Sequence, residues 1–220
     1  MNAKKEPRMP TPPTDRVVAP PALHHVTFKT TRLAAMIAWY GLLVGMRVNF
    51  QDQGAAWMTN DAANHRIALL AIPGLTDDPE KRSRTGMHHT AFEYPAMDDL
   101  MATYARLRDA GVVPAFSLDH GLTTSLYYSD PDSNVVELQV DNHGDWRQSS
   151  EWMRTAPEFR ANPIGVFFDP EKVYQAHRSG TPFADLQRQV YAGAFAPDTP
   201  PDLGIGRRRD ERGRHHVEPC

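Results

Sequence analysis

A pair of histidines occurs twice in the chain, each time at the start of a strand-like segment. Residues 23–28 read LHHVTF and residues 87–92 read MHHTAF, so that His25 and His89 occupy equivalent positions 64 residues apart. A carboxylate, Glu137, lies in the last apolar run of the second copy. Two histidines and one carboxylate form the facial triad that leaves half of an iron(II) coordination sphere open for substrate and dioxygen. These residues therefore predict a non-haem iron(II) oxygenase.

Each copy of the motif begins the same order of elements, β-α-β-β-β. In the first half, the helical spacing of apolar residues predicts a helix over 32–43, and alternation with turn residues predicts strands around it. The second half repeats this order around a helix predicted over 97–110. The predicted strands cover residues 23–30, 46–50, 55–59 and 65–72 in the first half, and 87–94, 112–117, 122–128 and 134–140 in the second.

A repeat of this length is too long for a solenoid unit. Two half-curled sheets are instead expected to pair into one incomplete barrel, an α+β fold, with a cleft between them. Strands beside the cleft would direct His25 and His89 inward, whereas alternation would point the preceding His24 and His88 away. Glu137 is flanked by apolar residues, and burying a carboxylate without a partner is costly. A ligand role is therefore expected for it as well.

The rest of the chain is predicted to be organised around this domain. The segment after Asn142 contains aromatic residues and prolines but too few regular elements to fold alone. It is predicted to be an arm that packs on the barrel or on a neighbouring subunit, and the protein is expected to be a homo-oligomer. The expected boundaries are 1–20 for a disordered N-terminal tail, 21–142 for the domain (modules 21–74 and 86–142), 143–206 for the arm and 207–220 for a disordered basic tail.

Composition argues against nucleic acid and membranes as partners. The net charge is −3, and acidic residues interrupt the arginines of the basic tail. No apolar run reaches the roughly 18 residues that a membrane span needs, and residues 1–20 lack the apolar stretch of a signal peptide. The single cysteine, Cys220, cannot form an intrachain disulfide. A cytoplasmic location is therefore expected.

Four local motifs, taken together, resemble a known protein family. They are the two histidine motifs, the segment NHRIAL at 64–69, and the run that begins at His120, continues with LYYSDP at 126–131 and ends at Glu137. With WYGLLVGM at 39–46 closing the first helix, residues 22–141 resemble the vicinal oxygen chelate superfamily. Within it, the chain is most similar to the type I extradiol catechol dioxygenases, in a form with one such domain.

This resemblance implies a metal and a substrate class. The ligands would be His25, His89 and Glu137, and the metal would be Fe(II), with Mn(II) as an alternative because the two ions share this donor set. The substrates would be a catechol-type aromatic molecule and dioxygen.

The resemblance also implies roles for three further residues. His65 would exchange protons with the catechol and with the cleaved intermediate. His120 and Tyr127 would hydrogen-bond the substrate oxygens and fix their orientation. The chain departs from the family pattern at Ser133, where glycine or proline is usual, and in the charged loop 77–84, which lengthens the distance between the histidine segments.

Two other functions on the same fold remain open. One is a glyoxalase-like isomerase or a thiol transferase, and the other is a metal-free protein that sequesters a ligand. Such isomerases and transferases often take a ligand from the last strand of the first module, but residues 67–72 read IALLAI and offer none. A binding protein has no need of two matched histidines and a glutamate. These observations favour the oxygenase.

Overall fold

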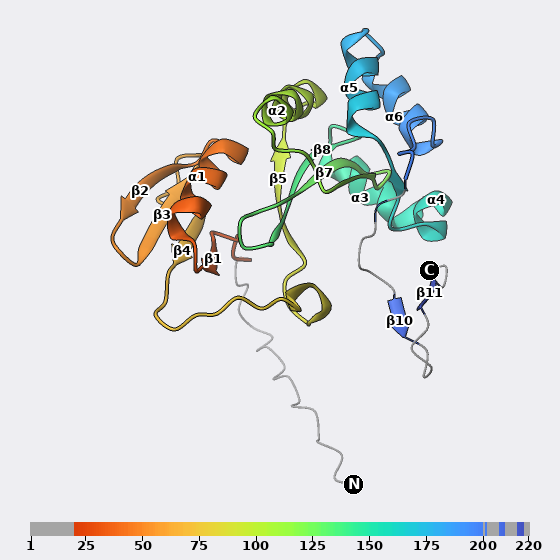
Figure 1. The fold of residues 1–220 in the computed structure, drawn as a ribbon. Helices are drawn as coiled ribbons and strands as arrows, with labels where there is room; N and C mark the ends of the chain where they lie inside the picture. Colours follow the sequence, from red (N-terminus) through yellow and green to blue (C-terminus); the bar gives the residue numbers. More distant parts are fainter. Residues whose placement is uncertain (1–19, 200, 202–206, 210–214, 218–220) are drawn as a thin grey trace, which may run out of the picture.

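The computed structural model describes residues 20–199, 201, 207–209 and 215–217. Within them the chain forms two modules of the same β-α-β-β-β order, which confirms the predicted duplication and the α+β class (Figure 1). The first module consists of β1 (Val26–Lys29), α1 (Leu33–Val44), β2 (Arg47–Gln51), β3 (Ala55–Thr59) and β4 (Ile67–Leu70). The second consists of β5 (His89–Tyr94), α2 (Met97–Asp109), β6 (Phe116–Asp119), β7 (Thr123–Ser129) and β8 (Val135–Asp141).

The largest difference from the predicted strand bounds is at the start of β6. A strand is expected from residue 112, but β6 begins at Phe116. The backbone N–H of Val112 donates to the carbonyl of Leu107 at 2.8 Å, and Gly111 has a φ of 79°. These residues therefore complete the C-terminus of α2, because a left-handed glycine lets the chain turn back over the last helical carbonyls.

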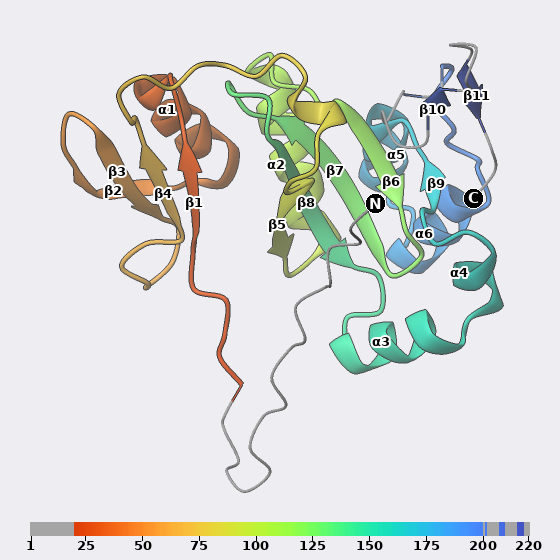
Figure 2. The ribbon, with the colours of Figure 1, turned by 90° about the horizontal axis from the view of Figure 1, so that it is seen from below.

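The strands form two main sheets, one from each module (Figures 1 and 2). The first sheet has the order β1-β4-β3-β2, and the second has the order β5-β8-β7-β6-β9, where β9 (Val166–Phe167) comes from the arm. In each sheet the first and last strands of the module lie parallel, with Val26 opposite Ile67 and His89 opposite Val135. Both histidine motifs therefore lie at a sheet edge, beside the last strand of their own module.

The two modules meet through their helices. Met36 and Leu43 of α1 are buried in the same hydrophobic core as Leu100 and Leu107 of α2. At the end of this contact, the buried hydroxyl of Tyr40 donates to a carboxylate oxygen of Asp130 at 3.3 Å. The guanidinium of Arg106 also donates to the carbonyls of Leu42 and Leu43 at the C-terminus of α1. Apolar packing and hydrogen bonds therefore both join the modules.

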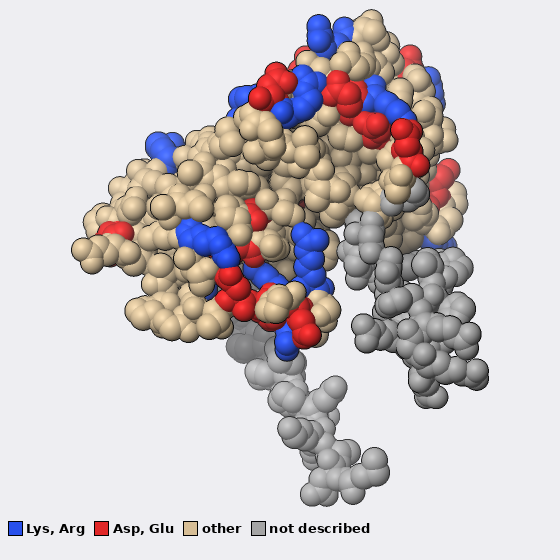
Figure 3. Space-filling model, in the orientation of Figure 1, with Lys and Arg blue, Asp and Glu red and all other residues tan. Residues whose placement is uncertain are grey.

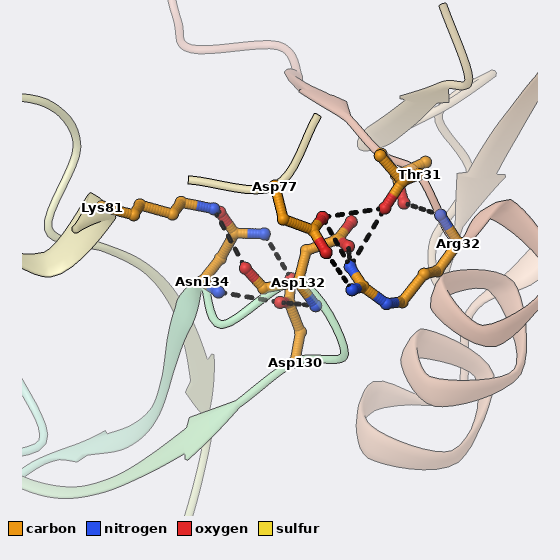
Figure 4. A network of polar contacts seen from close by, with 8 residues as sticks. Thr31, Arg32, Asp77, Lys81, Asp130, Asp132 and Asn134 are labelled. Atoms are coloured by element: carbon orange, nitrogen blue, oxygen red, sulfur yellow. Dashed lines mark hydrogen bonds and ion pairs between the residues drawn. The ribbon is translucent and has the colours of Figure 1, made fainter. Parts of the chain in front are cut away.

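A polar network connects the linker between the modules to both of them (Figure 4). Arg32, which precedes α1, pairs with Asp77 of the linker and with Asp132 of the turn between β7 and β8. Lys81, in the short 3-10 helix Lys81–Ser83, donates to the side chain of Asn134 in the same turn. In this part of the surface, acidic and basic side chains lie next to one another (Figure 3). The charged loop therefore lies at the junction of the two modules and contacts both of them.

The arm contains more regular structure than the sequence predicts. Its elements are α3 (Trp146–Thr155), α4 (Pro157–Ala161), β9, α5 (Pro170–Arg178) and α6 (Phe183–Tyr191). The expectation of few regular elements is therefore wrong, because the prolines do not interrupt the helices. Pro157 and Pro170 instead occupy the first turn of a helix, where the missing N–H costs nothing. The side chains of Asp145 and Asp169 cap α3 and α5 by accepting backbone N–H hydrogen bonds.

The arm packs on the second module of its own chain (Figure 2). Strand β9 pairs with β6, and α5 contacts α2. Phe168, Val173, Leu186 and Val190 are buried in the common core. The arm is therefore an extension of the second module.

The predicted tails lie mostly outside the described residues. Within the basic tail, Arg207–Arg209 and His215–Val217 form the antiparallel strands β10 and β11. In the part of the chain that the structure describes, no helix combines the length and apolar character that crossing a membrane requires.

Candidate active site

A buried carboxylate, Glu137, is the centre of the site in the second module. It lies on β8 with only 4% of its surface exposed, and its Oε2 is 3.0 Å from Nε2 of His89 on β5. Tyr127 lies directly opposite Glu137 in the β7–β8 register, and its hydroxyl donates to Oε1 at 2.7 Å. The pairing of three neighbouring strands therefore places these three side chains on one face of the sheet.

His120 extends this arrangement by one residue. It follows directly after the end of β6, and its Nε2 lies 2.8 Å from the Tyr127 hydroxyl and 3.9 Å from Oε1 of Glu137. The ring of Phe116 stacks on that of Tyr127, with 4.4 Å between centroids and an angle of 18°. Four side chains that the sequence singled out, His89, His120, Tyr127 and Glu137, thus form one continuous polar cluster.

The environment fixes the charge of these groups. Burial alone would raise the pKa of Glu137, but hydrogen bonds from His89, Ser125 and Tyr127 outweigh it and keep that pKa below its ordinary value. Burial and the neighbouring carboxylate raise the pKa of Tyr127 well above that of a free phenol. Burial lowers the pKa of His120. The site therefore combines an ionised carboxylate, a protonated tyrosine and a neutral histidine at neutral pH.

A second cluster, of histidines, lies in the first module. His24 and His25 precede β1, and His65 precedes β4, the parallel neighbour of β1. The Nδ1 atoms of His24 and His25 are 3.1 Å apart, and the rings of His25 and His65 are 4.4 Å apart. Partial desolvation and the two other imidazoles lower the pKa of His65 below its ordinary value.

The structure divides the predicted metal ligands between the two clusters. His89 and Glu137 are in contact, whereas His25 lies with His24 and His65. Among the described residues, those three histidines are the group whose ligand atoms all lie within 4.8 Å of one another. His25 and His89 nevertheless line the same cavity, which has a volume of about 880 Å³. The metal site formed by all three ligands therefore remains a prediction.

The expected orientation of the neighbouring histidines is wrong. Alternation predicts that His24 and His88 point away from the cleft, but His24 lines the same cavity as His25 and His89. The Nδ1 atoms of each neighbouring pair face one another, at 3.1 Å for His24 and His25 and at 2.8 Å for His88 and His89. The reason is that β1 begins at Val26 and β5 at His89, so that strand alternation does not extend to the residues before them.

Sequence reasoning missed two residues of the site. Ser125 helps to lower the pKa of Glu137. Phe116 stacks on Tyr127 and lines a second cavity of about 470 Å³ beside His88 and His89. The signal for Ser125 is present in the sequence, because it lies two positions before Tyr127 on one strand and so shares its face. Phe116 depends on the pairing of β6 with β7, in which it lies opposite Tyr127.

Comparison with known proteins confirms the family resemblance. The family described as the Glyoxalase/Bleomycin resistance protein/Dioxygenase superfamily matches residues 22–138. Two relatives from Rhodococcus globerulus, biphenyl-2,3-diol 1,2-dioxygenase 2 and biphenyl-2,3-diol 1,2-dioxygenase 3, are each 38% identical to this chain. Their alignments cover 84% and 78% of this chain and 96% and 90% of the relatives. Catechol-2,3-dioxygenase from Bacillus subtilis (strain 168) is 31% identical over 56% of this chain and 40% of its own length.

Proposed function

Because the chain belongs to the Glyoxalase/Bleomycin resistance protein/Dioxygenase superfamily, we propose that it is an extradiol dioxygenase that opens the ring of a catechol-type substrate with dioxygen. The observation that carries this proposal is the contact between His89, Glu137, Tyr127 and His120. A ligand pair and two hydrogen-bonding groups lie on one face of the second sheet. The relatives that cover most of this chain are named as dioxygenases of an aromatic diol.

The donor set suits a divalent metal ion. Glu137 is ionised although buried, and a buried carboxylate beside a histidine nitrogen at 3.0 Å is the kind of pair that a metal ion holds. In our proposal His25 is the third ligand, from the opposite side of the shared cavity. The ion would be iron(II), or manganese(II) with the same ligands. When bound, it would supply open positions for the two oxygens of a catechol and for dioxygen.

The other residues handle protons and orientation. His65 is neutral at neutral pH because its pKa is lowered, and it can therefore accept a proton from a catechol hydroxyl. The Tyr127 hydroxyl keeps its proton and can donate it in a hydrogen bond to a substrate oxygen. Nε2 of His120 lies 2.8 Å from the oxygen of the same hydroxyl and helps to hold it in place. The exposed edge of Phe116 supplies an apolar surface at the cavity beside His89.

The main alternative on this fold has less support. An isomerase of the glyoxalase kind would often use a ligand on the last strand of the first module. That strand, β4 (Ile67–Leu70), carries only Ile, Ala and Leu side chains. The second module therefore supplies two of the proposed ligands, and the first supplies one.

The test is anaerobic reconstitution followed by a substrate screen. The purified protein is loaded with iron(II) or with manganese(II), and catechol and biphenyl-2,3-diol are added with measured dioxygen. We expect stoichiometric oxygen uptake together with a coloured ring-cleavage product, and no uptake by Glu137→Gln. A protein that binds iron but consumes no oxygen with any catechol would contradict the proposal. Isomerisation of a glutathione hemithioacetal by the same protein would support the alternative.

A further inference from the structure

We propose that the turn formed by residues 162–165 of the arm is a positioning element for His120, which it holds against Tyr127 from outside the duplicated modules. This inference rests on the proposed function, since His120 belongs to the site described above. Two observations carry it: the approach of Gly165 to the β6 backbone and the closure of the turn by Asn162.

The arm approaches His120 through backbone pairing. Strand β9 lies antiparallel to β6, with Leu118 opposite Phe167 and Asp119 opposite Val166. Continuing this register by one residue places Gly165 opposite His120. A Cβ atom at Gly165 would lie 2.1 Å from the Asp119 carbonyl oxygen and 2.8 Å from the Cα of His120. Glycine is therefore required, both for this approach and for its φ of 96°.

The turn is closed by one side chain. Oδ1 of Asn162 accepts a hydrogen bond from the backbone N–H of Gly165 at 3.1 Å. Its Nδ2 donates to the carbonyl of Gly165 at 2.8 Å. These two bonds fix the direction of the peptide between Ile164 and Gly165, and with it the Ile164 carbonyl.

His120 is held from two sides. Its backbone lies against Gly165 of the turn, and its Nε2 lies 2.8 Å from the Tyr127 hydroxyl. The position of the His120 backbone therefore decides how its ring meets that hydroxyl.

The position of His120 determines what Tyr127 contacts. The Tyr127 hydroxyl has two neighbours, Nε2 of His120 at 2.8 Å and Oε1 of Glu137 at 2.7 Å, and it donates to the carboxylate. A displaced His120 ring would leave this hydroxyl with the carboxylate as its one partner in the cluster.

The arm also holds the other side of the β6–β7 turn. A Cβ at Gly121, next to His120, would lie 2.1 Å from the Trp152 ring of α3. The amide of Gln187 in α6 donates to the Gly121 carbonyl at 3.2 Å. The turn that carries His120 is thus enclosed by three elements of the arm, α3, β9 and α6.

The experiment compares Gly165→Ala and Asn162→Ala with wild type in the full, iron-loaded chain. A displacement of about 1 Å can cost about 10²-fold in rate, so we expect kcat to fall by about that factor in Gly165→Ala. KM and iron content should stay unchanged. Asn162→Asp keeps the acceptor for Gly165 and should retain more activity than Asn162→Ala. Val173→Ala removes a buried side chain of α5 away from His120. It should lower stability without lowering kcat.

Two further measurements separate positioning from general loss of structure. In a His120→Gln background, Gly165→Ala should cause no additional loss of kcat, because its effect acts through that ring. Imidazole nitrogen NMR of the metal-free full chain should give His120 signals, assigned by their absence in His120→Gln, that change in Gly165→Ala and stay unchanged in Val173→Ala.

Unchanged ring signals and unchanged kcat in both arm variants would overturn the proposal. So would an undiminished effect of Gly165→Ala in the His120→Gln background. If the wild-type protein cleaves no catechol, the proposed function fails, and the NMR comparison still decides whether the arm positions the ring of His120.

Discussion

The two oxygens of Glu137 have different partners, Oε2 with His89 and Oε1 with Tyr127. This difference separates a ligand role from a hydrogen-bonding role among neighbouring residues. A metal ion would replace the contact between Glu137 and His89, whereas Tyr127 and His120 would keep theirs. Substitutions of these residues should therefore fall into two groups.

The first group consists of the proposed ligands. His25→Ala, His89→Ala and Glu137→Ala should each lose bound iron and oxygen uptake, because two remaining protein ligands hold a labile divalent ion weakly. Iron content per chain, measured after desalting, checks this. His88→Ala is the matched control, since it removes the imidazole next to His89 and should keep iron. Full iron occupancy in any of the three ligand variants would rule out this triad.

The second group consists of the proton-handling residues. His65→Phe and Tyr127→Phe should keep iron but reduce kcat by about 10²–10⁴-fold, the usual cost of losing general acid–base catalysis. Oxygen uptake over a range of pH, on protein of verified iron content, measures this. A wild-type rate for His65→Phe across that range would assign the proton transfer to another residue.

Asp119, which precedes His120, should make stability depend on pH. Burial raises its pKa from 3.8 to about 6, although hydrogen bonds from Gly121, Thr124 and Asn142 oppose this. Between about pH 4 and pH 6 the unfolded chain has lost this proton while the folded chain retains it. Asp119 therefore makes the protein less stable as pH rises through this window, with a slope of at most about 1.4 kcal/mol per pH unit, and its contribution is constant above it.

Asp119→Asn should remove this contribution. Urea unfolding of both proteins at several pH values gives the difference in the free energy of unfolding. We expect that difference to shift in favour of Asp119→Asn as the pH rises from about 4 to about 6. A difference that is constant over the window would contradict the raised pKa.

At the scale of elements, the arm completes the second module. Its strand β9 covers the edge of β6, and three of its apolar side chains, Phe168, Val173 and Leu186, are buried in the common core. A chain that ends at Asn142 should therefore expose apolar surface and one sheet edge, and should aggregate or change its oligomeric state. Size-exclusion chromatography with light scattering measures this, and the same experiment on the full chain tests the expected homo-oligomer. A truncated protein of native size that cleaves substrate normally would show that the arm is dispensable.

Local patterns account for the parts of the structure that the sequence predicted well. The strands and helices of both modules follow from periodicity, and the contact of Tyr127 with Glu137 follows from a short hairpin whose register places them opposite one another. The position of His25 relative to His89 is different. It depends on how α1 packs on α2 and on the direct pairing of Arg32 with Asp132, which are contacts between residues far apart in the chain. Hydrophobic periodicity predicts local elements and not contacts between distant residues, so the complete metal site could not be derived from the sequence.

At the scale of the whole molecule, one of the contacts that join the two modules is made by a buried hydroxyl. The Tyr40 hydroxyl donates to Asp130, so Tyr40→Phe should lower the free energy of unfolding by about 1 kcal/mol, the usual contribution of one hydrogen bond. Tyr128→Phe is the matched control. Tyr128 is equally buried, but its hydroxyl has no hydrogen-bond partner among the described residues, so its removal should be neutral or stabilising. Equal destabilisation of both variants in urea unfolding would contradict this view of the junction.

The position of β9 in the second sheet has a consequence for how the chain is made. All strands of the first sheet lie between Val26 and Leu70, so this sheet has every strand it needs once that segment has left the ribosome. The second sheet needs β9, which ends at Phe167, before β6 has both neighbours. During synthesis, which proceeds at about 5–20 residues per second, the segments therefore emerge in a fixed order. His25 and His65 gain their surroundings first, the ligand pair of the second module follows, and the support of His120 comes last.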